Sequence, residues 1–130
     1  MVVPPDPSLA NAPPEGVTGN ACLDVGLGFE LVGDAQALNE LLALARESLT
    51  RDVALIAQKI EENDVREANK LLHSLKGFAP IFCAQSLAEE IARVEILSKT
   101  CTAAELREPY HALRPRLSRL HDEIARYLGQ

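Results

Sequence analysis

One short stretch of the chain places a histidine beside residues that suit phosphoryl chemistry. Side chains three and four positions apart share one face of a helix, so Lys76 and Gly77 follow His73 on its face. Asn69 lies on the same face one turn earlier. Imidazole is nucleophilic in its neutral form, which predominates near neutral pH. These residues therefore predict a nucleophilic histidine on an exposed helix face.

Lys76 and Gly77 would each serve a phosphoryl group attached to His73. The Lys76 ammonium can neutralise phosphoryl oxygens as a point charge. Gly77 has no side chain and would let a partner or the phosphoryl oxygens come close to the helix. Glycine inside a helix costs about 1 kcal/mol relative to alanine, so its presence favours a functional reason. An exposed histidine or lysine alone is usually an ordinary surface residue, and only their combination favours a site.

The opposite face of this segment is apolar and would anchor it in a core. Leu72, Leu75 and Ala79 lie on that face. Hydrophobic residues make up 47% of the 130-residue chain and aromatic residues only 4%. The apolar residues are mostly leucine, alanine, isoleucine and valine, and leucine and alanine are good helix formers. The composition therefore predicts packing of helix against helix.

Apolar residues recur at helical spacing in five segments of the chain. These segments cover residues 24–31, 38–60, 65–82, 87–97 and 106–128. Asp34, Asp64 and Thr102 are the predicted N-caps of three of the helices. The pattern predicts an all-α fold for residues 23–130, an antiparallel four-helix bundle with a short extra N-terminal helix.

Three prolines fall within these helical patterns. Pro80 removes a backbone hydrogen bond, so we expect a kink or an early end to the third helix. Pro109 suits a first turn or a bend, and Pro115 should bend its helix without ending it. Residues 1–22 hold five of the eight prolines and read as a disordered proline-rich tail or linker.

Charge, hydropathy and cysteine spacing argue against several classes of protein. The net charge of -6 is unlike that of nucleic-acid binders, which present a basic face. The sequence shows neither a membrane span nor a signal peptide, so we expect a cytoplasmic protein that does not insert into the membrane. Cys22, Cys83 and Cys101 fit neither a disulfide framework nor a metal site. They are expected to be reduced thiols, with Cys83 half-buried.

The stretch from Leu72 to Ala79 resembles the signature of histidine-containing phosphotransfer (HPt) domains. It reads Leu-His-Ser-Leu-Lys-Gly, then Phe78 and Ala79. Fainter similarity extends over residues 23–128 and includes the distal Glu95. At Phe78, Pro80 and Cys83 the chain departs from the family's usual residues.

The resemblance implies a carrier in a multistep two-component phosphorelay. His73 would accept a phosphoryl group from a receiver-domain aspartate and pass it to another receiver, with Lys76 neutralising its charge and Gly77 admitting the partner. Such a carrier is a monomer without an ATP site, enzymatic activity or a cofactor of its own, and Mg²⁺ belongs to the partner receiver. It would be a free HPt protein or the C-terminal domain of a hybrid sensor kinase, tethered in that case to the inner membrane.

The receiver should dock on apolar residues around His73. Leu27, Phe29 and Phe78 are candidates, together with the polar Asn69, although core packing explains the apolar residues equally well. A helical module that binds a receiver without carrying phosphate remains the alternative, because Phe78 and Pro80 alter the turn after the histidine.

Two other motifs are weaker. Residues 24–28 match an Asp-x-Gly-x-Gly box of kinase ATP-binding domains, but the α/β sandwich that such a box needs is missing from the pattern. Glu108 and His111 have the spacing of a di-metal bundle ligand pair, but the pair stands alone, and no metal site is predicted. His111 and His121 are expected to be structural or solvated.

Overall fold

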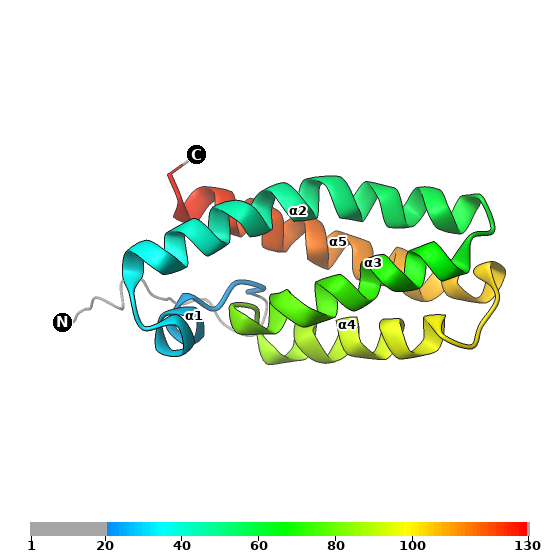
Figure 1. Cartoon of the computed structure of the whole chain (residues 1–130), viewed down its shortest axis with the longest axis horizontal. Helices are drawn as coiled ribbons and strands as arrows, with labels where there is room; N and C mark the ends of the chain where they lie inside the picture. The colour runs from blue at the N-terminus through cyan, green and yellow to red at the C-terminus, as the bar shows by residue number, and fades with distance from the viewer. Residues whose placement is uncertain (1–20, 130) are drawn as a thin grey trace.

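The computed structural model describes residues 21–129, and within that range the chain forms a bundle of long helices (Figure 1). The elements are α1 (Val25–Val32), α2 (Ala35–Glu61), α3 (Val65–Phe78), the short 3-10 helix η2 (Ala79–Ile81), α4 (Gln85–Ser98) and α5 (Ala103–Tyr127). Helix α2 packs against α3 and α5, and α4 packs against the same two helices. Helix α1 lies across one end, against α2 and η2. The predicted antiparallel four-helix bundle with an extra N-terminal helix is confirmed.

Side-chain caps fix where the helices begin. Asp34 accepts a hydrogen bond from the N–H of Ala37 at 2.8 Å, and Asp64 accepts one from Glu67 at 3.2 Å. Thr102 forms a reciprocal capping box with the residue three positions later. The three predicted N-caps are confirmed, and Asp24 caps α1 in the same way. Each cap satisfies an otherwise unpaired N–H of the first turn and so fixes the residue at which the helix begins.

Two residues with positive φ make the sharp reversals before the second and third helices. Gly33 adopts φ 83° between α1 and α2, and its N–H donates to the Phe29 carbonyl at 2.7 Å. Asn63 adopts φ 62° between α2 and α3. Glycine enters this left-handed region without steric cost, and asparagine tolerates it better than most residues. Both connections therefore stay short, and α2 and α3 run antiparallel.

Pro80 ends the helix that carries His73, as predicted. Helix α3 stops at Phe78 and continues as η2, because proline has no N–H to donate and clashes with the preceding turn. The chain then pairs with the N-terminal segment, since Asp24 N–H donates to the Phe82 carbonyl at 2.7 Å. Pro109 and Pro115 lie inside α5, which continues through both, and Pro109 stands beyond its first turn.

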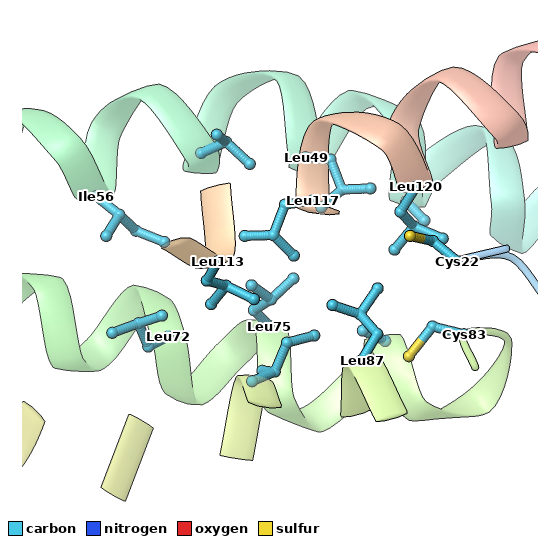
Figure 2. Packing of buried hydrophobic residues seen from close by; sticks show 14 of the residues in the cluster. Cys22, Leu49, Ile56, Leu72, Leu75, Cys83, Leu87, Leu113, Leu117 and Leu120 are labelled. Carbon is cyan, nitrogen blue, oxygen red and sulfur yellow. The ribbon is translucent and has the colours of Figure 1, made fainter. Parts of the chain in front are cut away.

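The core is filled mainly by the predicted apolar stripes (Figure 2), but Leu31 of the predicted first helix is 61% exposed. Leu97, assigned to the stripe of the fourth helix, is 37% exposed, and Glu95 and Ser98 are buried in its place. Cys22, assigned to the tail, is buried in the core, and its carbonyl accepts from Ala84 N–H at 2.8 Å. The fold therefore includes Cys22, and the rest of the predicted tail up to residue 20 lies outside the described residues.

The three thiols differ in burial, and we expect them to differ in reactivity. Cys83, expected to be half-buried, is fully buried, and burial raises its pKa to about 12. Burial also raises the pKa of Cys22 and of Cys101, but Cys101 keeps part of its surface exposed. Because the thiolate is the reactive form, iodoacetamide at pH 8 should alkylate Cys101 at least about tenfold faster than the other two. Mass spectrometry of native and urea-unfolded protein checks this, and rapid native labelling of Cys83 would contradict it.

Candidate functional site

His73 lies in the second half of α3 and points away from the core. Its side chain is 70% exposed, whereas Leu72 and Leu75 on the opposite face are buried. The Asp64 cap sets the start of the helix, and Pro80 sets its end. The helix therefore holds the imidazole in solvent while two leucines anchor it from behind.

A buried carboxylate on α4 lies against the imidazole. The Glu95 side chain has no exposed surface, and its Oε2 is 3.4 Å from Nδ1 of His73. A carboxylate only accepts hydrogen bonds, so this contact favours the tautomer with the proton on Nδ1. The lone pair is then on Nε2.

Two lysines share the same carboxylate. Nζ of Lys76 lies 3.2 Å from Oε1 of Glu95, and Nζ of Lys99 lies 3.8 Å from Oε2. Both ammonium groups reach the surface, since Lys76 is part-exposed and Lys99 more so. The lysine that the sequence assigns to the phosphoryl group therefore pairs with a buried acid in this structure.

Asn69 and Ser98 tie the two helices together around Glu95. The amide nitrogen of Asn69 donates to Oγ of Ser98 at 2.8 Å and lies 3.3 Å from Oε2 of Glu95. The Ser98 hydroxyl donates to the Glu95 carbonyl at 2.6 Å. Asn69 thus holds the carboxylate of Glu95 and Ser98 bonds to its backbone, and neither contact involves His73 or a lysine.

Glu95 is ionised at neutral pH despite its burial. Burial by itself raises the pKa of a carboxyl group, but hydrogen bonds from Lys76 and Asn69 and the charges of Lys76 and Lys99 outweigh it. The net pKa of Glu95 is lower than the ordinary value of 4.5. The site thus holds a fixed negative charge under its exposed histidine.

The lowered pKa of Glu95 predicts an acid-dependent loss of stability. Between the folded and unfolded pKa values the unfolded chain binds more protons, so the free energy of unfolding falls as pH falls. The contribution is complete above the unfolded value of about 4.5 and is lost as pH drops through the folded pKa. Urea unfolding between pH 6 and 3 should show that the free energy of unfolding falls more steeply with falling pH for the native chain than for Glu95→Gln. A difference in the free energy of unfolding that stays constant with pH would contradict the lowered pKa of Glu95.

The sequence model of the Hpt domain family matches residues 40–129. The chain belongs to the Hpt domain family. The match covers most of α2 and all of α3, α4 and α5, and it includes His73 and Glu95. Searches among curated proteins and among solved structures give no significant match.

Hpt domains are helical phosphocarriers of two-component phosphorelays and interact with receiver domains. None of the helices between residues 21 and 129 combines the length and hydropathy that a membrane span requires. Within the same range, no cluster of three or more His, Cys, Asp and Glu side chains could hold a metal ion.

Gly77 of this Hpt domain faces open space. A Cβ added there would meet no atom within 4 Å outside its own helix. Packing therefore does not require glycine at this position, whereas Gly28 of α1 would bring a Cβ within 2.9 Å of Leu38. Close approach of a partner at Gly77 stays a prediction.

The three apolar docking candidates differ in exposure. Phe29 on α1 is 50% exposed, whereas Leu27 and Phe78 are each partly buried. The Phe78 ring lies 6.1 Å from that of Phe82, centroid to centroid, and so covers the end of the core. Phe29 keeps the most surface for a partner, and binding by these residues and by Asn69 stays a prediction.

The sequence argument did not assign Glu95, Ser98 or Lys99 to the site. A signal was present, because Glu95 and Ser98 continue the helical spacing of Leu87 and Ile91 on the core face of α4. A charged residue is almost never fully buried unless it is paired. A carboxylate on an apolar stripe therefore marks a buried ion-pair site, with Lys99 one turn further on.

Proposed function

We propose that this Hpt domain carries a phosphoryl group on His73 between receiver-domain aspartates. The observation that supports this most is the contact of Glu95 with His73. It engages Nδ1 and so leaves the lone pair on Nε2, in a side chain that is 70% exposed. Docking alone would not need a buried carboxylate behind an exposed imidazole.

The transfer is an in-line displacement at phosphorus. The Nε2 lone pair forms the N–P bond as the O–P bond to the receiver aspartate breaks, and that carboxylate leaves with the electron pair. The ring keeps its Nδ1 proton and gains positive charge, which Glu95 stabilises from 3.4 Å. Passing the group to the next receiver reverses these steps. Catalysis is then mainly positioning and charge neutralisation.

Other residues of the site would bind the phosphoryl group or contact the receiver domain. The Lys76 ammonium is one turn from His73 and would pair with the phosphoryl oxygens. Gly77 leaves room for the receiver, and Phe29 offers apolar surface beside η2. In this scheme the carrier uses no ATP and no metal of its own, and a Mg²⁺ ion bound by the receiver would help to neutralise the phosphoryl group during transfer. A monomeric carrier, free or joined to a hybrid kinase, satisfies these requirements.

Phosphotransfer from a panel of ³²P-labelled receiver domains tests the proposal. We expect at least one receiver to transfer label to the native chain, and the product should be acid-labile and alkali-stable, as a phosphoramidate is. Binding of each receiver is measured in parallel by calorimetry. Receivers that bind without ever transferring label would instead identify a docking module.

A further inference from the structure

Three charged side chains meet at the contact between α3 and α4, and only one of them is negative. Glu95 lies between Lys76 of α3 and Lys99, the C-cap residue of α4. Two ammonium groups and one carboxylate leave one positive charge in excess, since His73 attacks as a neutral ring. The site therefore carries one excess positive charge before His73 is phosphorylated.

The two lysines are placed differently with respect to His73. Lys76 is one turn after the histidine on the same helix, so its flexible side chain can reach either Glu95 or a group on the ring. Lys99 caps the C-terminal end of α4, one turn after Glu95, and its Nζ approaches Oε2, the oxygen that also faces His73. Lys99 can therefore stay beside Glu95 whatever Lys76 does.

Phosphorylation of His73 would set two anions in competition for Lys76. A protein-bound phosphoryl group carries a charge of about -1.5 to -2 at neutral pH. Glu95 has no exposed side-chain surface and pairs with both lysines, so the departure of one lysine removes part of its charge neutralisation. A buried charge that loses its partner is strongly destabilising. In a carrier that had Lys76 but no Lys99, pairing of Lys76 with the phosphoryl group would leave Glu95 without a counter-charge.

We propose that Lys99 is a positioning residue that keeps Glu95 neutralised while Lys76 turns to the phosphoryl group on His73. The inference rests on the proposed carrier function and adds a second lysine to it. Lys99 acts through Glu95 and does not touch the reacting atoms. Its presence shifts the phosphoryl equilibrium from the receiver toward His73.

The equilibrium ratio of label between one receiver and the chain measures this effect. We expect Lys99→Gln to lower the fraction of label on His73, with a ratio about three- to tenfold smaller than in the native chain. Lys99→Arg keeps the charge and should restore the ratio. Lys59→Gln is the matched control, because it removes a lysine from an i,i+3 pair with Glu62 on α2. It should leave the ratio unchanged.

A double-mutant cycle separates this role from a direct one. A neutral amide at position 95 needs no counter-charge, so Lys99→Gln should have no effect in the Glu95→Gln background. The inference is overturned by an equal effect in both backgrounds, which would place Lys99 on the phosphoryl group or the receiver. An unchanged ratio in the single variant overturns it as well. If the native chain takes no label from any receiver, the carrier function fails and the inference fails with it.

Discussion

Replacing His73 with glutamine should abolish acid-labile labelling by every receiver that labels the native chain. The amide side chain has no nucleophilic nitrogen, so no N–P bond can form. The fold should survive, because the His73 side chain is 70% exposed and its one polar contact within residues 21–129 is with Glu95. The expected loss is complete within detection, in an autoradiograph of receiver and carrier after a few minutes of transfer.

His111→Gln is the matched control for this experiment. His111 is also exposed and helical, but it lies on α5, which packs against α2 and α4. This variant should take up label at the native rate. Far-UV circular dichroism and the thermal midpoint verify that both variants are folded. Residual alkali-stable label on His73→Gln would mean that another residue accepts the group.

The second large effect concerns stability, at the residue that anchors the site helix from behind. Leu75 is buried in the centre of the bundle, on the face of α3 opposite His73 (Figure 2). Truncation to alanine removes apolar contacts and leaves a cavity, which should lower the free energy of unfolding by about 2–5 kcal/mol. Urea unfolding followed by circular dichroism measures the change.

Leu44→Ala gives the matched comparison on α2. Its side chain is also leucine in a helix, but it is 63% exposed, so truncation should change stability by no more than about 0.5 kcal/mol. Similar losses in the two variants would contradict the assignment of Leu75 to the core. Phosphotransfer by Leu75→Ala, measured where it is still folded, should remain detectable because the substitution leaves Glu95 and Lys76 in place.

Local chemistry allowed much of the fold to be predicted from the sequence. Asp34, Asp64 and Thr102 cap helices through bonds to residues three positions away, which any reader of the sequence can locate. Pro80 ends α3 because of its own ring and missing N–H. Helical periodicity likewise placed His73 outward and the neighbouring leucines inward. None of these inferences needed knowledge of which helices meet.

The partners of His73 were decided by the tertiary structure. Glu95 lies 22 residues away, and only the packing of α4 on α3 brings its carboxylate to the imidazole. Cys22 was assigned to a tail because it ends a segment rich in proline and glycine, yet its backbone pairs with the segment after η2. Such contacts depend on the relative placement of elements, which periodicity along one element does not encode. The sequence by itself thus determined the exposed face on which His73 lies, and the packing of α4 on α3 supplied the buried carboxylate that contacts it.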